Sequence, residues 1–487
     1  MVFSSPIFLF AYLPVVLSLY FLIPFRLRNG FLLLASLFFY AWGDAAFALC
    51  LVLSIVGNYA FGVLIERAAL QGRPRASRRT VTAAIGFNLA MLIGFKYANF
   101  LVNNLSACLG AFGLPPLHLA PIHLPIGISF FAFQAMSYVI DVYRGDVHAT
   151  RSLVDFGMYK SFFPQLIAGP IVRYRDVAAQ IVERRTTSQD FIAGMRRFII
   201  GLGKKVLIAN SVAGVADHVF GLKAADLTAG LSWLGAGCYA IQIYFDFSGY
   251  SDMAIGMGRM FGFRFLENFN YPYGSRSIRE FWRRWHISLS TWFRDYLYIP
   301  LGGNRGRPLR VYANLIVVFF LCGLWHGASW TFVVWGLWHG LFLVLERLGF
   351  GRQIERMPAP FQHAYALVAV LIGWVFFRAE SLPYAVGFVK AMFGFGSGNP
   401  SVYYPALFVD RVAQLALLCG LLFSVPAGPA LDRAITAWLC RRGARPRSAA
   451  WEVGRGMAQA AALALIFVAS AMELAVGTYN PFIYFRF

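Results

Sequence analysis

The chain has 487 residues, of which 59% are hydrophobic and only 13% are charged. A soluble domain averages about 45–50% apolar and about 25% charged residues, so this composition excludes an ordinary water-soluble protein. The formal charge of +21 would suit a nucleic-acid-binding protein. The basic residues, however, form separate clusters between apolar runs, as in the cytoplasmic loops of membrane proteins. We therefore expect a membrane protein without a nucleic-acid partner.

The apolar runs predict a single all-α membrane domain over residues 1–487. A spanning helix needs about 20 mainly apolar residues. No Lys or Arg precedes the first run, so we expect an uncleaved span rather than a secretory signal. The short second run and Asp44 after it suggest a tight hairpin. We expect about 11–12 spans, near 7–24, 31–43, 47–65, 80–100, 124–141, 198–218, 229–247, two within 312–345, 363–378, 404–425 and 457–475.

The basic clusters support these spans independently, because charge was not used to choose them. When the chain is followed from span to span, every cluster falls on the same side of the membrane. The positive-inside rule assigns that side to the cytoplasm, which places both termini on the opposite side. The clusters are Arg26 with Arg28, Arg67–Arg79, Arg173–Lys205, Arg276–Arg310, Arg347–Arg356 and Arg441–Arg447.

Two segments do not resemble simple spans. Residues 155–172 are apolar but contain Lys160, Pro164 and Pro170. Because proline breaks helices, and broken backbone at membrane depth must be buried in protein or line a cavity, we predict a re-entrant or interfacial segment. Residues 252–310 are rich in Arg and Trp, which predicts short amphipathic helices at the cytoplasmic face.

Two acidic residues follow the apolar run at 229–247. Asp246 and Asp252 could pair with an Arg or His in a cavity, or could end the helix through an Asx-type cap. We favour helix termination. The sequence has no P-loop and no His-Glu-x-x-His zinc motif, and we expect no metal site.

Residues 311–345 contain no Asp, Glu, Lys or Arg, yet they hold two Trp-His-Gly motifs. Histidine suits general base catalysis, and an ionisable residue inside a membrane suggests function. A hydrogen bond to a neighbouring helix is the alternative. On one continuous helix, His326 and His339 would differ by about 140° and would not share a face. His326 lies deeper in the run and is our catalytic candidate, whereas we expect a structural role for His339.

The segment 276–310 combines eight Arg residues with interleaved Trp residues and His286. It could form an interfacial belt against anionic lipid headgroups. It could equally form a mouth that holds the phosphates of a substrate such as a coenzyme A thioester, because Arg matches phosphate oxygens.

Several motifs together resemble the membrane-bound O-acyltransferase superfamily, and most closely the group of membrane subunits for bacterial alginate O-acetylation. The resemblance covers nearly the whole chain. It is carried by Met1–Ser5, Ser161–Pro170, Tyr244–Met253, Glu280–Ser290, Gly302–Arg305, Gly323–Gly327 and Pro481–Phe487.

The resemblance implies an all-α fold of spanning helices around a central tunnel. It also implies a membrane-embedded O-acetyltransferase of the bacterial inner membrane, with His326 and His286 as its catalytic residues. Acetyl-CoA in the cytoplasm would be the donor substrate, and no cofactor is expected. The acetyl group would pass to periplasmic acetyltransferase partner proteins, which modify an exported polysaccharide such as alginate. We expect substrate contacts from Trp325, Arg283, Arg284, Asn304 and Arg305, and membrane lipid around the protein.

Three other functions remain open from the sequence. A transporter or flippase would also have many spans with intramembrane polar residues. His286, His326 or His339 could ligate haem. Within the enzyme class, the acceptor could be a lipid or a protein instead of a polysaccharide pathway.

Overall fold

The computed structural model describes all residues except 168, 442–448, 478–479 and 481–487, and every regular element among them is helical. Most of the last basic cluster and the closing motif at 481–487 lie outside the described residues. The first half contains η1 (Phe8–Tyr12), α1 (Leu13–Leu22), α2 (Phe25–Leu70), α3 (Pro74–Leu92), η2 (Ile93–Tyr97), α4 (Ala98–Ala111), α5 (Ile128–Arg144), α6 (Leu153–Ser161), α7 (Phe163–Leu166), α8 (Tyr174–Val182), α9 (Ser188–Gly203), η3 (Lys204–Ala209), α10 (Asn210–Phe220), η4 (Ala224–Asp226) and α11 (Ala229–Met260). The second half contains η5 (Pro272–Gly274), α12 (Ile278–Arg284), α13 (Ile287–Phe293), η6 (Arg294–Tyr298), α14 (Pro308–His326), α15 (Trp330–Leu345), η7 (Glu346–Phe350), α16 (Gly351–Arg356), α17 (Ala359–Arg378), α18 (Leu382–Met392), η8 (Pro405–Leu407), α19 (Arg411–Phe423), α20 (Ala427–Arg441) and α21 (Ala449–Ala475).

Seven helical stretches of the described chain are long and apolar enough to cross a membrane. They are Phe25–Leu70, Pro74–Ala111, Ser188–Phe220, Pro308–His326, Trp330–Arg356, Ala359–Arg378 and Trp451–Ala475. The remaining expected spans correspond to the shorter apolar helices Phe8–Leu22 and Arg411–Phe423, to α5, and to the largely buried α11. The expected spans at 31–43 and 47–65 belong to one element, α2, which is kinked at Asp44 without a loop. The all-α membrane fold is therefore confirmed.

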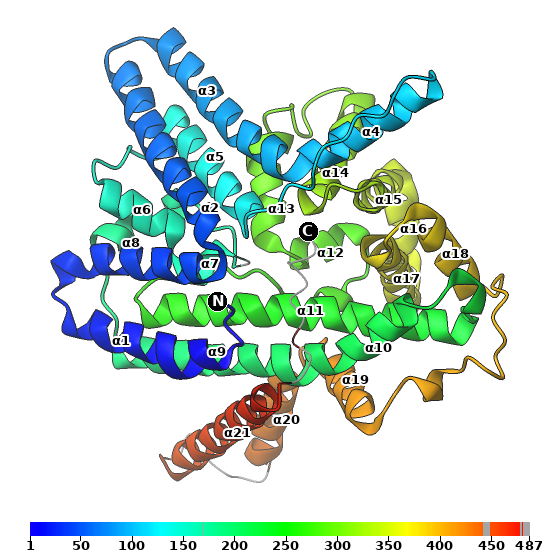
Figure 1. Ribbon diagram of the computed structural model, residues 1–487. Helices are drawn as coiled ribbons and strands as arrows, with labels where there is room; N and C mark the ends of the chain where they lie inside the picture. Colours follow the sequence, from blue (N-terminus) through cyan, green and yellow to red (C-terminus); the bar gives the residue numbers. More distant parts are fainter. Residues whose placement is uncertain (168, 442–448, 478–479, 481–487) are drawn as a thin grey trace.

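The centre of the molecule is a close-packed pair of helical rods. The α9–η3–α10 rod runs along α11, as Figure 1 shows. Glycines permit this approach: a Cβ built on Gly201 would lie 2.5 Å from the carbonyl oxygen of Gly249, and one on Gly194 would lie 2.6 Å from that of Gly256. Small residues that bring helix backbones together are typical of membrane helix interfaces.

Ion pairs join the same two rods, and they correct the interpretation of Asp246 and Asp252. Both residues lie inside α11, so neither ends a helix. Asp246 lies 2.7 Å from Lys205, and Asp252 lies 2.6 Å from Lys204 and 2.8 Å from Arg197. Charged residues inside a membrane protein are retained where they pair with one another, so α11 continues past its carboxylates because α9 and η3 supply the cations.

The two segments that do not resemble simple spans both contain short helices, but the predicted start of the second segment is wrong. Residues 155–172 contain the end of α6 and the four-residue α7, separated by a break at Phe162, and the described residues after Asp155 are buried in protein. Of the segment 252–310, the part up to Met260 is the end of α11 and was wrongly assigned to amphipathic helices. The remainder forms α12, α13 and η6.

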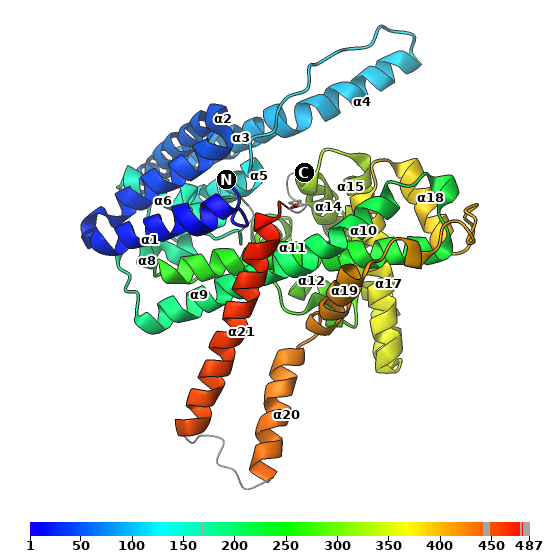
Figure 2. The same cartoon turned by 60° about the horizontal axis from the view of Figure 1, so that its bottom comes forward.

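The α3–α4 arm and the junction of the two chain ends complete the fold. Helices α3 and α4 form an arm, and α4 projects away from the other helices in Figure 2. None of the residues of α4 is buried. The two ends of the described chain meet, because Asn480 Nδ2 donates to the carbonyl of Ser4 over 3.2 Å.

Candidate active site

The candidate base, His326, is the last residue of α14. Gly327 is extended, and α15 begins three residues later with Ser329 as its N-cap. The helix break corrects the argument from helical rotation, because His326 and His339 lie on two helices that pack against each other and not on one. The rings of His326 and His339 both contact Trp335, at centroid distances of 4.9 and 5.3 Å.

Glycines bring α14 and α15 together directly behind the histidine. A Cβ on Gly323 would lie 2.3 Å from the carbonyl oxygen of Phe332, and one on Gly336 would lie 2.2 Å from that of Phe319. No side chain larger than hydrogen fits at that distance. The sequence therefore fixes the position of His326 through backbone contact between the two helices.

A cavity of about 650 Å³ reaches His326. The histidine is 95% buried, with 5% of its surface exposed, and it lines this cavity together with Trp325. The ring is therefore not enclosed by solid protein. The other walls come from Gly43, Asp44, Lys96, Pro121–Phe130 and Ile167.

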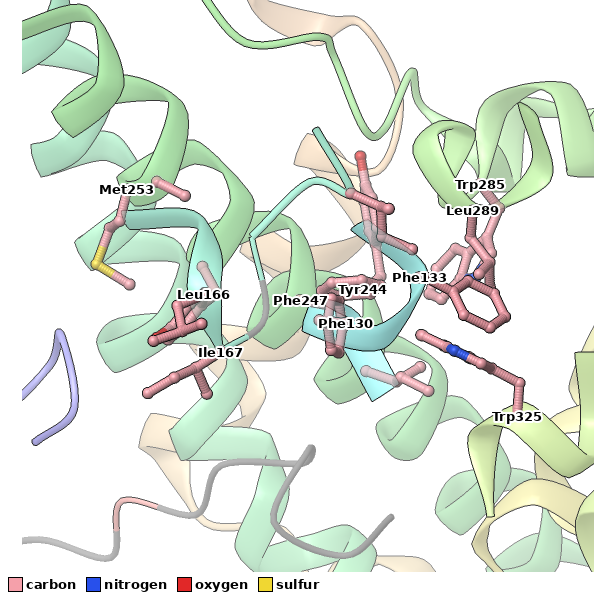
Figure 3. Close-up of a cluster of buried hydrophobic side chains, with 14 of the residues drawn as sticks. Phe130, Phe133, Leu166, Ile167, Tyr244, Phe247, Met253, Trp285, Leu289 and Trp325 are labelled. Atoms are coloured by element: carbon pink, nitrogen blue, oxygen red, sulfur yellow. The ribbon is translucent and has the colours of Figure 1, made fainter. Parts of the chain in front are cut away.

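Trp325 connects the cavity to the second candidate histidine. It reaches from the end of α14 toward Phe130 and Phe133 of α5 (Figure 3), with ring centroids 5.3 and 5.4 Å away. Its ring also lies 6.0 Å from that of His286 and 4.9 Å from that of His326. The structure thus brings Trp325, His326 and His286 together, although His286 is fully buried and does not itself line the cavity.

His286 occupies the sharp turn between α12 and α13. Its φ of 43° and ψ of 56° are left-handed, which is uncommon for a residue with a side chain. Its Nδ1 lies 3.1 Å from Oδ1 of Asn268, and that oxygen also accepts from the Ser288 hydroxyl over 2.9 Å. The backbone N–H of Ser288, which can only donate, also donates to this Oδ1 over 3.2 Å and fixes the orientation of the amide, so Nδ2 donates to Ser251 Oγ. Nδ1 therefore carries the proton, and Nε2 is left as an acceptor.

The predicted substrate contacts in the Arg-rich segment lie away from the cavity. Arg283 is exposed, and Arg284 pairs with Glu280 over 2.8 Å. Arg305 is exposed, and Asn304 Oδ1 accepts from Tyr298 and Arg347. The loop that holds Asn304 and Arg305 precedes α14, so it lies about 27 Å of helix rise from His326.

The same face of the molecule carries a cluster of ion pairs around Asp295. This carboxylate lies 2.6 Å from Arg294, 2.7 Å from Arg173 and 3.4 Å from Arg175. Partial burial opposes its ionisation, but the hydrogen bonds from Arg294 and Arg173 outweigh burial and hold the pKa of Asp295 below its ordinary value. Several arginines of the basic clusters are thus structural partners of carboxylates.

His339 lies in an aromatic cluster. It is fully buried on α15 and stacks on Phe281, with ring centroids 6.0 Å apart and an interplanar angle of 8°. Among the described residues, neither of its ring nitrogens has a hydrogen-bond partner. It does not line the cavity.

Lys96 and Asn268 are two site residues that the sequence interpretation missed. Lys96 lines the cavity beside His326, and Asn268 holds His286. Lys96 could have been found, because it is an ionisable residue near the end of the expected span at 80–100 and the argument applied to His326 applies to it equally. Asn268 lies in a loop, and no local signal marks it.

Comparisons with known proteins agree with this geometry. The model of the MBOAT (membrane-bound O-acyltransferase) family matches residues 126–382. The chain is 46% identical to probable alginate O-acetylases AlgI of Azotobacter vinelandii and of Pseudomonas putida, over the full length of both chains in each case. It is 37% identical to the peptidoglycan O-acetyltransferase of Helicobacter pylori, over 81% of this chain and 80% of that protein.

Proposed function

Because the chain belongs to the membrane-bound O-acyltransferase family, we propose that it transfers acetyl groups from cytoplasmic acetyl-CoA for the O-acetylation of an exported polysaccharide. The chain is a multi-pass membrane protein and an O-acyltransferase. The proposal adds the donor, the direction of transfer and the polymer, which is alginate or a similar exopolysaccharide. It also adds the bacterial inner membrane and periplasmic partner proteins that receive the acetyl group.

One observation carries the proposal: a histidine at the end of a spanning helix lines a cavity large enough for an acceptor. His326 takes the proton from an acceptor hydroxyl while the hydroxyl oxygen attacks the thioester carbonyl. The new C–O bond forms, the C–S bond breaks, and the coenzyme A thiolate leaves and takes the proton. General base catalysis of this kind contributes about 10²–10⁴-fold.

We assign His286 to orienting the acceptor, a role that requires the hydroxyl to reach past Trp325, because His286 contacts Trp325 but does not line the cavity. Its Nε2 is an acceptor, because Asn268 holds the proton on Nδ1. An accepting nitrogen can receive a hydrogen bond from a hydroxyl but cannot donate one to an oxyanion. Of the two roles considered for His286, the structure therefore favours orientation of the hydroxyl over stabilisation of the oxyanion.

Inside-out membrane vesicles from cells that contain the whole acetylation system provide the test. With acetyl-CoA labelled in the acetyl group, we expect release of free coenzyme A thiol outside the vesicles and labelled ester on carbohydrate inside them. Vesicles with the His326→Ala variant should show neither. Intact acetyl-CoA accumulating inside the vesicles would contradict the proposal and support a transporter. Label in lipid or on a protein alone would assign another acceptor.

A further inference from the structure

The carbonyl end of α14 is held by the α3–α4 arm. The last four carbonyls of an α-helix have no partner within the helix. In α14, the backbone N–H of Gly327 donates to Gly323 O over 3.3 Å. The Tyr97 hydroxyl donates to Leu324 O over 2.8 Å. Lys96 Nζ donates to both remaining carbonyls, those of Trp325 over 2.5 Å and His326 over 3.1 Å.

Lys96 and Tyr97 end the π-helical turn η2, where α3 bends into α4. Such turns are rare in helices and frequently occur at functional sites. The two residues are more than 220 positions away from α14 in the chain. Within the arm, α3 packs against α2 and α5, whereas α4 has no buried residue. Lys96 and Tyr97, where the two helices meet, are therefore placed to hold the end of α14 by hydrogen bonds.

The hydrogen bonds of Lys96 show how it acts. Its third donor contact is with Ser129 Oγ, over 3.1 Å. An ammonium group has three N–H donors, so none remains for a substrate. No carboxylate of the described chain lies within ion-pair distance of Lys96. The positive charge of Lys96 is stabilised by the carbonyl oxygens at the C-terminal end of α14, which is the negative end of the helix dipole.

The geometry points to Lys96 and Tyr97 as positioning residues for acyl transfer. They fix the last turn of α14 against the cavity wall and thereby set the direction of the His326 ring. Lys96 does so from inside the cavity that His326 lines. This inference rests on the proposed catalytic role of His326. A displacement of a reacting group by about 1 Å can cost about 10²-fold in rate, so small movements of this helix end matter.

Substitution in the full-length protein, purified into lipid nanodiscs and supplied with the partner proteins and polysaccharide that accept the acetyl group, tests the inference through the kcat and KM of acetyl-CoA turnover. For Lys96→Met, which removes the ammonium group but keeps an unbranched chain of four heavy atoms, we expect kcat to fall about 30- to 100-fold with KM within about twofold of wild type. For Tyr97→Phe, which loses one neutral hydrogen bond, we expect a fall of about fivefold. Because the cavity is open, ethylammonium should restore part of the activity of Lys96→Ala, and ethanol should not.

Lys160 offers a matched control. It is also a fully buried lysine that donates to a carbonyl and a hydroxyl, both of Ser54, but it does not line the cavity. Lys160→Met should lower the amount of folded protein and leave the kcat of that protein unchanged.

Different results would show failure of the inference and failure of the proposed function. A wild-type kcat in Lys96→Met would overturn the inference. The inference would also fail if Lys96→Met, like Lys160→Met, lowered only the yield of folded protein. If Lys96→Met does not fold, unchanged kcat in Tyr97→Phe would overturn the inference. By contrast, full activity in His326→Ala, or no turnover by the wild type, would overturn the proposed function itself.

Discussion

The backbone of His286 is held in a conformation that costs energy. A left-handed conformation in a residue with a side chain costs on the order of 1–3 kcal/mol and persists where the surroundings over-determine it. Here the hydrogen bonds of Asn268 with the ring and with Ser288 provide that constraint. The result is an imidazole whose accepting nitrogen has no hydrogen-bond partner among the described residues. Buried polar atoms are normally satisfied, so we interpret this nitrogen as reserved for the acceptor hydroxyl.

Replacing His286 by asparagine removes the imidazole and leaves the turn that carries it. Asn adopts left-handed conformations more readily than most residues. We therefore expect His286→Asn to accumulate in membranes like the wild type and to lose activity about 10- to 100-fold, within the range for positioning and proton-transfer groups. The measurement is polysaccharide O-acetyl content in cells, normalised to the protein in the membrane. Wild-type acetylation would show that His286 only shapes the turn.

At the scale of elements, the hairpin of α14 and α15 determines where the base lies. Gly323 and Gly336 let the two backbones touch, and the hairpin turns immediately after His326. Because both helices are also packed against aromatic side chains of α12 and α17, they have little room to separate. Enlarging a glycine in this hairpin should therefore affect both stability and the site.

Gly336→Ala tests that coupling. Its Cβ would lie 2.2 Å from a backbone oxygen, so the helices must move apart, at a cost of about 1–3 kcal/mol or more. We expect a lower midpoint of thermal unfolding in detergent and reduced activity per folded molecule. Gly237→Ala, on α11, is the control, because nothing lies within 4 Å of its Cβ. Equal behaviour of the two variants would contradict the close-packing argument.

Local sequence patterns predicted the helices well but not their long-range partners. Apolar runs located the spans, and the glycine and proline positions located the break at 155–172, because these signals are local. The extension of α11 past Asp246 depends on Lys205 of another element. The support of His286 depends on Asn268, and that of α14 on Lys96. Such contacts cannot be read from the periodicity of either partner alone.

At the scale of the whole molecule, the two ends of α14 lie in chemically different surroundings. Its N-terminus follows the Arg-rich loop with Asn304 and Arg305, and its C-terminus carries His326 in the cavity. The far wall of that cavity comes from Pro121–Gly127, next to the loop that the positive-inside rule places outside the cytoplasm. His326 therefore lies at the end of α14 that is opposite the Arg-rich loop.

Cysteine labelling tests this orientation. Cys108 lies exposed near the end of α4, at the end of the spanning stretch Pro74–Ala111 that the positive-inside rule places outside the cytoplasm. In a variant that retains only this cysteine, a membrane-impermeant maleimide should label Cys108 in spheroplasts. A single cysteine at Arg307, which is exposed just before α14, should react only after the membrane is permeabilised. The reverse pattern would contradict the orientation and the direction of transfer.

The most direct test of the account compares the two Trp-His-Gly histidines. His326 lines the cavity, whereas His339 is enclosed by aromatic side chains. The rings of both histidines contact Trp335. Both are replaced by alanine in cells that export the polysaccharide, and O-acetyl groups are counted per protein molecule in the membrane. The account predicts no acetylation with His326→Ala, and a lower protein level but wild-type acetylation per molecule with His339→Ala. Acetylation retained in His326→Ala protein would contradict it.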